Sequence, residues 1–391
     1  MLVKQAAEIT NAFALETMGY DAAPVQEDLT GFIEFGQTVI SSQTDFDNLF
    51  RTLPDRIART IFVNRPYNPD YPSIMMDSWE YKSIVMKVHS KTPEAQDNMT
   101  WGLEDGMSVD QNIVYIPEIS VKFFNKLITW EIPQTITRKQ LLSALADESE
   151  YVALLSMLEN EIEKAMTIRE GESIMAAINN AIAENIYDAT QGNPENLNQT
   201  STLRVVNLKK LWEDAHQDTL FDTLEEALEN KDFAKFAVHT INKYPKRLSR
   251  INKNFNIGGT EKFTPSDKLK CVFLDEFIEY LPFYLYGDTY NSEDVKLLST
   301  ETVPYWQASG DDFSLDHITS INVITGEGHT VSAEGVLGIM FDRDAIALYR
   351  KNRYTTTSPY NARGEYYDNF HKYEGEYCND FNENMVVFVF A

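Results

Sequence analysis

The fold is decided by the segment from Gly335 to Ala391, which reads GVLGIMFDRDAIALYRKNRYTTTSPYNARGEYYDNFHKYEGEYCNDFNENMVVFVFA. Its first apolar run, Val336 to Phe341, is too short for a helix and is rich in branched and aromatic residues, so it predicts a buried strand. Further extended segments follow, and the segment ends in the uncharged run MVVFVFA from Met385. Because a free edge of this kind promotes aggregation, we expect this closing strand to be paired inside a sheet.

A loop at Asn361 to Glu365 interrupts this succession of strands. Asn361 and Gly364 are turn formers, and Arg363 is held out between them. The strand that follows, from Tyr366, is rich in tyrosine and phenylalanine, which have large apolar rings. The sequence therefore predicts a strand, an ordered loop, an aromatic strand and a final apolar strand, in that order.

This order resembles the C-terminal part of tailed-phage major capsid proteins of the Hong Kong 97 fold, most of all those of small short-tailed, Picovirinae-type podoviruses. The resemblance implies an α+β fold with a peripheral domain, an axial domain, an extended two-stranded loop and an N-terminal arm. It also implies that Asn361, Arg363 and Glu365 meet neighbouring subunits, where Arg363 would pair with a carboxylate. An exposed loop arginine is the alternative for Arg363, and the last hairpin of a soluble α/β enzyme is the alternative for the segment.

Composition limits the class of protein and of partner. The 391 residues, 43% of them apolar, suffice for two or three folded units. A net charge of −26 argues against tight binding to nucleic acid, which relies on clustered lysine and arginine. The first residues lack the pattern of a signal peptide and no apolar run approaches a membrane span, so we expect folding in the cytosol without a membrane partner. Cys271 and Cys378 show no spacing of a disulfide framework or zinc site.

The first two segments are interpreted as an arm and the start of the peripheral domain. Residues 1–30 predict a short helix and an arm, too short for a scaffolding segment, so we expect scaffolding to be a separate protein. In residues 31–65, helical spacing ends at Pro54 and a strand is predicted at Ile57 to Val63. The DRI tripeptide from Asp55 resembles the residues that precede the extended loop in capsid proteins of small short-tailed phages.

Residues 66–117 are interpreted as the extended loop. Apolar and polar residues alternate in KSIVMKVHS from Lys82, as in a two-stranded ribbon with one apolar face. Because a lone ribbon is marginal in water, this face needs a partner surface. In the resembled family the loop lies across the neighbouring subunit, which makes Lys82 and Lys87 candidates for contacts between subunits. A hairpin packed on its own domain is the alternative.

Residues 118–200 are interpreted as the second part of the peripheral domain. Thr137 and Gln140 stand at the spacing of a capping box and mark the start of a helix. Apolar residues at i+3 and i+4 then predict one long helix from Ser149 to about Tyr187. The apolar stripe shifts around Gly171, and we expect this spine helix to bend there when the shell expands.

Residues 201–332 are interpreted as the axial domain. Helices are predicted at Leu203 to Ala215 and at Phe221 to Lys231, and a strand at Lys268 to Phe277. Residues 333–391 then complete the peripheral domain, and their closing strand returns towards the axial domain.

The only basic concentration of the sequence lies in this axial segment, in KYPKRLSRINKN from Lys243. Arg247 and Arg250 are candidates for contacts with acidic patches of adjacent subunits, and a solvated helix face is the ordinary alternative.

No catalytic, cofactor or metal site is predicted. The six histidines fall in different segments without paired ligand spacing, and the glycine-rich pieces lack the residues that complete a phosphate loop. We therefore expect a structural protein and not an enzyme.

The sequence as a whole is interpreted as a major capsid protein that assembles with itself, as pentamers and hexamers, into the icosahedral head of a tailed bacteriophage. Other expected partners are a separate scaffolding protein, a portal protein and packaged double-stranded DNA, contacted weakly and without sequence specificity. The protein would assemble in the host cytoplasm and reside in the virion capsid. The alternatives are an encapsulin-type compartment shell and a soluble acidic α/β enzyme.

Overall fold

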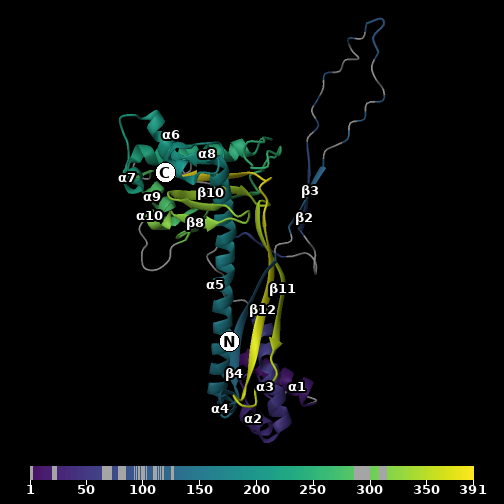
Figure 1. Ribbon diagram of the computed structural model, residues 1–391. Coiled ribbons are helices and arrows are strands. Elements are labelled where there is room, and N and C mark those ends of the chain that lie inside the picture. Colours follow the sequence, from purple (N-terminus) through teal and green to yellow (C-terminus); the bar gives the residue numbers. More distant parts are fainter. Residues whose placement is uncertain are drawn as a thin grey trace. The chain divides into compact units, whose positions relative to one another are not determined.

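The computed structural model describes residues 3–19, 24–63, 73–77, 85–91, 119–124, 127–285, 300–307 and 315–391, with scattered positions between 93 and 116. The chain forms two compact units, each assembled from three separate segments. Unit 1 comprises Met1–Asp70, Leu127–Ser173 and Arg350–Gly375, and unit 2 comprises Tyr71–Lys126, Ile174–Tyr349 and Glu376–Ala391. Both contain helices and strands, which confirms the α+β class (Figure 1).

Unit 1 has a core made by helices. They are α1 (Val3–Thr17), α2 (Phe32–Ser41), α3 (Gln43–Val63), α4 (Arg138–Ala144) and the first part of α5 (Glu148–Ala189). Phe13, Phe32 and Tyr151 are fully buried in one cluster, and the ring centroids of Phe32 and Tyr151 lie 4.7 Å apart. The helix predicted in the first thirty residues is therefore confirmed, and it forms part of this core.

The strand predicted at Ile57 to Val63 is wrong, because α3 continues as one helix from Gln43 to Val63. Phe46, Leu49, Phe50 and Leu53 are all buried, so packing fixes the first half of the helix before Pro54 is reached. A proline inside a helix costs about 3 kcal/mol, and this packing offsets that cost. The β-branched residues after Pro54 disfavour a helix by less than about 1 kcal/mol each, too little to end it.

A four-stranded sheet has the strand order β1-β11-β12-β4. Its strands are β1 (Met75–Asp77), β11 (Ile346–Thr357), β12 (Tyr366–Asn379) and β4 (Leu127–Thr137). In unit 1, Trp130 of β4 stacks on Tyr373 of β12 with ring centroids 4.6 Å apart. β4 ends in the predicted capping box, in which the Thr137 hydroxyl accepts from the Gln140 backbone N–H and the Gln140 side chain accepts from the Thr137 N–H. The predicted helix start is confirmed.

The long helix predicted from Ser149 is also confirmed. It is α5, 42 residues long, and it is unbroken at Gly171. Its buried stripe consists of Tyr151, Leu155, Leu158 and Ile162 in unit 1 and of Ile174, Ile178, Ile182 and Ile186 in unit 2. The division between the two units falls after Ser173, so each unit contains part of this helix.

Unit 2 is organised around a five-stranded sheet of order β5-β13-β10-β6-β7. The strands are β5 (Val205–Asn207), β13 (Met385–Val389), β10 (Val336–Asp342), β6 (Leu269–Leu274) and β7 (Glu301–Val303). β10 runs antiparallel to β13 and β6, with Met340 opposite Val386 and Cys271, while β13 pairs in parallel with β5. Every residue of β10 and β13 is buried. Both predicted strands are confirmed, and the closing strand is paired on both sides.

Helices pack about this sheet in unit 2 (Figure 1). They are α6 (Leu208–Ala215), α7 (Leu224–Glu229), α8 (Lys231–Leu248), α9 (Asp275–Leu285), α10 (Leu315–Ile318) and the 3-10 helix η2 (Pro194–Gln199). Three predictions need correction here. The helix expected from Leu203 begins only at Leu208, because the preceding residues pair with β13 and Asn207 caps the helix.

The other two corrections concern element ends. The helix expected at Phe221 to Lys231 is divided at Asn230, which ends α7 and whose side chain caps α8. The strand expected up to Phe277 ends at Leu274, where α9 begins with two acidic residues that favour a helix N-terminus.

Two two-stranded pairs complete unit 2. β2 (Val85–Ser90) pairs antiparallel with β3 (Ile119–Phe124), and β8 (Ile321–Ile324) pairs with β9 (Thr330–Ala333). A two-stranded ribbon is therefore present as β2 and β3, but β3 lies after residues 66–117, where the ribbon was predicted, and within the segment assigned to the peripheral domain. Among the described residues, no helix combines the length and the apolar character needed to cross a membrane.

Candidate assembly surfaces

The loop between β11 and β12 is held by hydrogen bonds to its own backbone. The Asn361 side-chain oxygen accepts from the N–H groups of Arg363, at 3.2 Å, and of Gly364, at 3.0 Å. Asn361 also bridges backbone to backbone with Tyr366, and the Glu365 carbonyl accepts from the Arg138 N–H at 2.8 Å. Arg363 is exposed and forms no ion pair with any residue that the structure describes. The loop thus presents the exposed Arg363 side chain from a fixed backbone.

The inner face of the β2–β3 ribbon is fixed to a fully buried carboxylate, Asp380, which sequence reasoning missed. His89 Nε2 lies 3.2 Å from Asp380 Oδ2, Lys87 Nζ lies 3.5 Å from the same oxygen, and Lys122 Nζ lies 3.6 Å from Oδ1. Lys87 also donates to the Asp344 carbonyl. These partners are far apart in the sequence, so only the folded chain brings them together.

The outer face of the same ribbon is apolar and exposed. The register places Met86 opposite Phe123 and Val88 opposite Val121. These four side chains are 56%, 62%, 55% and 46% exposed, and Ile119 at the ribbon's end is 61% exposed. Residues of alternating sequence position share a face of a ribbon, so this is one continuous apolar face. We call Met86, Val88, Ile119, Val121 and Phe123 the ribbon face.

The lysines predicted to make contacts between subunits differ in what the structure shows of them. Lys82 lies outside the described residues. Lys87 lies on the inner face of the ribbon and is already paired with Asp380 of its own chain. A contact of Lys87 with another subunit stays a prediction.

Arg247 lies in the last turn of α8, and Arg250 lies two residues after the helix ends at Leu248. Arg247 stacks over the Tyr244 ring at 5.0 Å, and burial raises the pKa of the Tyr244 hydroxyl although the nearby Arg247 lowers it. The basic residues of this segment are exposed, and none forms an ion pair with a described residue. They are Lys243, Lys246, Arg247, Arg250 and Lys253.

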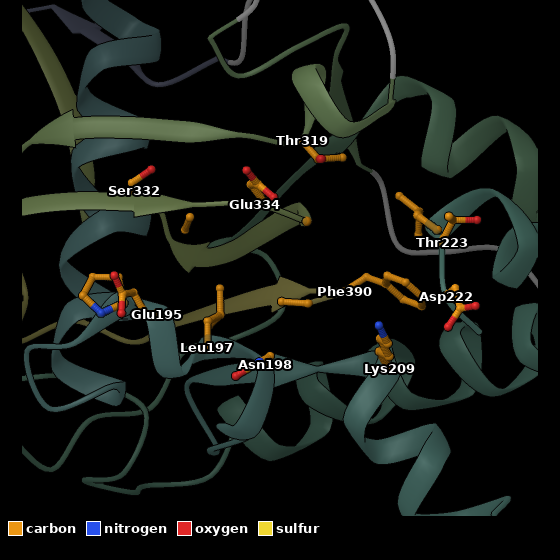
Figure 2. A pocket seen from close by; sticks show the side chains of 15 residues that line it. Glu195, Leu197, Asn198, Lys209, Asp222, Thr223, Thr319, Ser332, Glu334 and Phe390 are labelled. Atoms are coloured by element: carbon orange, nitrogen blue, oxygen red, sulfur yellow. The ribbon is translucent and has the colours of Figure 1, made fainter. Parts of the chain in front are cut away.

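A pocket of about 500 Å³ lies beside the end of β13 (Figure 2). Its walls come from η2, the start of α7, α6, β9 and the closing residues, and it is lined by Leu197, Leu224 and Phe390 among apolar groups. The Lys209 ammonium lies over the Phe390 ring at 5.6 Å. Three carboxylates, those of Glu195, Asp222 and Glu334, also line it. The pocket therefore joins an apolar floor to an acidic rim.

Two groups with metal-ligand side chains also occur among the described residues: His89, Asp380 and Glu383, and Glu184, Glu327 and His329. In the first, Lys87 and Lys122 already supply positive charge beside Asp380, which disfavours a cation. In the second, Glu184 is engaged by His329 Nδ1 at 3.1 Å. Asp380 and Glu184, the buried carboxylates of the two groups, are therefore already in contact with side chains of the chain itself.

Gly171 is buried inside α5, two residues before the division between the units. Directly before it, the buried carboxylate of Glu170 forms ion pairs with two arginines of β11. Arg350 Nη2 lies 3.0 Å from Glu170 Oε2, and Arg353 contacts the other carboxylate oxygen. The helix is thus tied to the sheet of unit 1 up to the residue before Gly171. Bending at Gly171 stays a prediction.

The surfaces described so far suit repeated contact between copies of the chain and contain no catalytic constellation among the described residues. A model of the Phi29-like phage major capsid protein family matches residues 10–389. The chain belongs to this family. The sequence-based prediction of a tailed-phage major capsid protein is confirmed, and the protein forms the shell of a phage capsid. Membership of this family favours the phage shell over the encapsulin-type and enzyme alternatives.

Solved structures of low identity are also similar to this capsid protein. A chain in the capsid of Staphylococcus phage Andhra is 10% identical, with 82% of this chain and 83% of that chain covered and a TM-score of 0.46. A chain in the structure of the head fiber and inner core protein gp22 of native bacteriophage P68 is 12% identical, with coverage of 83% and 87% and a TM-score of 0.48. A chain of the cyanophage Pam1 capsid is 8% identical, with coverage of 84% and 91% and a TM-score of 0.44. No curated protein matches the chain.

Proposed function

We propose that the subunits assemble as pentamers and hexamers into an icosahedral shell around the double-stranded DNA of a tailed phage, and that the ribbon face carries a principal contact. The observation that carries this proposal is the exposure of five apolar side chains on one face of a ribbon whose other face is already anchored. A two-stranded ribbon is marginal in water unless one face is covered. The neighbouring subunit supplies that cover.

The energetics favour coverage of this face in every subunit contact. Burying one such side chain contributes about 1.5–3 kcal/mol, and the same contact recurs at each position of a shell. The inner face supports the arrangement, because Asp380 ties both strands of the ribbon and fixes the direction in which the apolar face points. A preorganised face loses less conformational entropy on binding.

Charge substitution on the ribbon face tests this proposal. Val88→Asp and Val121→Asp place a carboxylate in the middle of the face without touching its anchor, and we expect folded subunits that form no particles. Ile324→Asp is the matched control, because Ile324 is an apolar strand residue that is 74% exposed outside the ribbon. Negative-stain microscopy counts particles and circular dichroism reports folding. Normal particle yield from both valine variants would refute the role of the ribbon face.

The remaining partners are proposed from the charge and packing of the chain. Helix α1 is packed into the core of unit 1, which supports scaffolding by a separate protein and not by removal of this helix. The net charge of −26 supports weak, non-specific contact with packaged DNA. A portal protein at one vertex and assembly in the host cytoplasm complete the proposal. Co-expression with the scaffold should convert irregular assemblies into shells of uniform diameter.

The capsid domains are proposed as predicted from the sequence: an arm at 1–30, peripheral segments at 31–65, 118–200 and 333–391, an extended loop at 66–117 and an axial domain at 201–332. The closing strand β13 pairs with β5, a residue range of the axial domain, which supports its return towards that domain. We propose a purely structural role without catalysis or cofactor.

A further inference from the structure

The basic end of α8 and the acidic pocket beside β13 are complementary surfaces at opposite ends of one helix. Asp222 and Leu224 line the pocket at the start of α7, and α8 follows α7 directly through Asn230. The basic residues lie at the other end of α8, which is 18 residues long. At 1.5 Å per residue α8 is about 27 Å long. One copy of the chain cannot bring the two surfaces together.

The pocket is shaped and charged for a long cationic side chain. Its three carboxylates outnumber the single lysine that lines it, and that lysine is already stacked on Phe390. Figure 2 shows Glu195, Asp222 and Glu334 around the hollow, with Leu197 and Phe390 between them. The aliphatic part of a lysine or arginine packs on apolar side chains while its charged end meets carboxylates.

The surface next to the pocket also carries several carboxylates close together. The pKa of Glu276 is raised by its partial burial and then by the nearby Glu225, Glu279 and Asp275. Glu225 belongs to the acidic first turn of α7, directly after the pocket residues Asp222 to Leu224. Like charges this close raise the free energy of the isolated subunit, and a cationic partner lowers it.

The basic end of α8 offers the matching surface. The segment from Lys243 to Asn254 has five cations and no acid, in a chain of net charge −26. It also carries exposed apolar side chains, since Ile251 is 65% exposed and Phe263, close to it through the Asn252–Lys262 bridge, is 54% exposed. The basic end of α8, which is also partly apolar, thus matches the acidic and partly apolar pocket in charge and in polarity.

We propose that the basic end of α8 in one subunit binds the acidic pocket of the next subunit, so that copies of the chain join head to tail. This inference rests on the proposed assembly and names a second contact within it. A contact between two different patches is heterologous, and it generates a closed ring when the rotation between copies allows closure. It therefore accounts for rings of subunits, which the ribbon face alone does not require.

Charge reversal tests the pairing. Arg247→Glu with Arg250→Glu reverses the charge at two positions of the basic end of α8, and Asp222→Lys with Glu334→Lys reverses it at two positions of the pocket rim. We expect each pair of substitutions to abolish particles and all four together to restore them. Lys139→Glu with Lys164→Glu changes the net charge by the same amount as the arginine pair at exposed sites of unit 1, and it should leave particles intact. Circular dichroism and thermal unfolding identify any variant that is unfolded.

Mixing the two non-assembling variants gives a second outcome that only head-to-tail pairing predicts. The two glutamates introduced into one variant can pair with the two lysines introduced into the other, and the unchanged surfaces of the two variants also match, so the two must alternate around a ring. Six-membered rings close under this rule and five-membered rings do not, so the mixture should yield sheets or tubes of hexamers without closed shells.

The outcomes separate this inference from the proposed function. If the arginine pair, or its milder form Arg247→Gln with Arg250→Gln, assembles as well as the wild type, the pocket contact is wrong while shell formation stands. If the four-fold variant is folded and still fails to assemble, the pairing of these two patches is also refuted. If the unmodified chain forms no particles with its scaffold, the proposed function itself fails.

Discussion

At the scale of single residues, Gly335 is the backbone position on which the closing strand depends. It has a φ of +74°, and a Cβ there would overlap the carbonyl oxygen of Phe390, whose N–H donates to the Gly335 carbonyl at 2.7 Å. Gly335→Ala adds this backbone overlap to the cost of a left-handed conformation, so we expect a loss of more than about 2 kcal/mol of unfolding free energy.

Gly328 provides the matched control for that substitution. Its φ is +92°, yet nothing lies within 4 Å of an added Cβ. Gly328→Ala should therefore cost only the conformational part, about 1–2 kcal/mol. Urea denaturation of both variants measures the difference, and equal losses would mean that the Phe390 carbonyl simply moves aside.

Asp342 gives a stability effect that depends on pH. Burial is the largest cause that raises the pKa of this carboxyl above its ordinary value of 3.8. The folded state then binds the proton more tightly than the unfolded state, so the stability gained from the protonated form is present at low pH and is lost as pH rises through the raised pKa. At neutral pH the ionised, partly buried carboxylate of Asp342 lowers the free energy of unfolding.

Asp342→Asn should accordingly stabilise the protein at neutral pH, with a gain that shrinks as the pH falls through the raised pKa towards 3.8. The new amide oxygen can still accept from the Asp344 N–H, a bond of 2.9 Å in the wild type. Asp344→Asn is the control, because Asp344 is half-exposed and paired with Lys268 at 3.1 Å. Thermal unfolding across pH measures both, and an Asp342→Asn variant less stable than the wild type at neutral pH would contradict the prediction.

Substitution of Arg363 is expected to affect assembly without affecting folding. The loop is held by Asn361 and by the Glu365 carbonyl, and these bonds do not involve the Arg363 side chain. Arg363→Ala should leave the unfolding free energy within about 0.5 kcal/mol of the wild type, as for other surface substitutions, while particle yield falls. Unchanged yield and unchanged thermal stability of the particles would identify an ordinary exposed arginine.

At the scale of elements, α5 is the part whose flexibility matters most to the proposed function. Gly171 lowers helix stability by about 1 kcal/mol relative to alanine, and it lies directly after the Glu170 anchor and just before the division between the units. Gly171→Ala should raise thermal stability and slow the expansion of assembled shells. Ser156→Ala, which raises helix propensity on the same helix far from Gly171, is the control. Expansion at the wild-type rate, followed by light scattering, would exclude flexure there.

The elements also show how far sequence could predict this fold. β10, β13, the capping box and α5 were predictable because local pattern and tertiary role agree: an apolar run is buried, and a 3.6-residue stripe faces a core. The second half of α3 could not be predicted, because the packing of Phe46 to Leu53 outweighs the tendency of Pro54 to end a helix. Asp380 could not be predicted either, because nothing near it in the sequence indicates that two lysines and a histidine converge on it.

At the scale of the whole molecule, assembly should change the chemistry of the ribbon face. Met86 is 56% exposed in the isolated chain, whereas Met340 in β10 is 1% exposed. Hydrogen peroxide should therefore oxidise Met86 quickly in free subunits and slowly in shells, with Met340 slow in both. Peptide mass spectrometry measures the two rates, and equal oxidation of Met86 in subunits and shells would show that the ribbon face stays in water.

The position of β13 also sets the timing of folding during synthesis. This strand follows the other four strands of its sheet along the chain and is therefore synthesised after them, yet it lies inside the sheet, between β10 and β5. Until residue 389 emerges from the ribosome, both of those strands have an unpaired edge, and the core of unit 2 is incomplete. A nascent chain is therefore unable to present the finished pocket beside β13 to neighbouring polysomes. We therefore expect subunits to become competent for assembly only once translation has passed this strand.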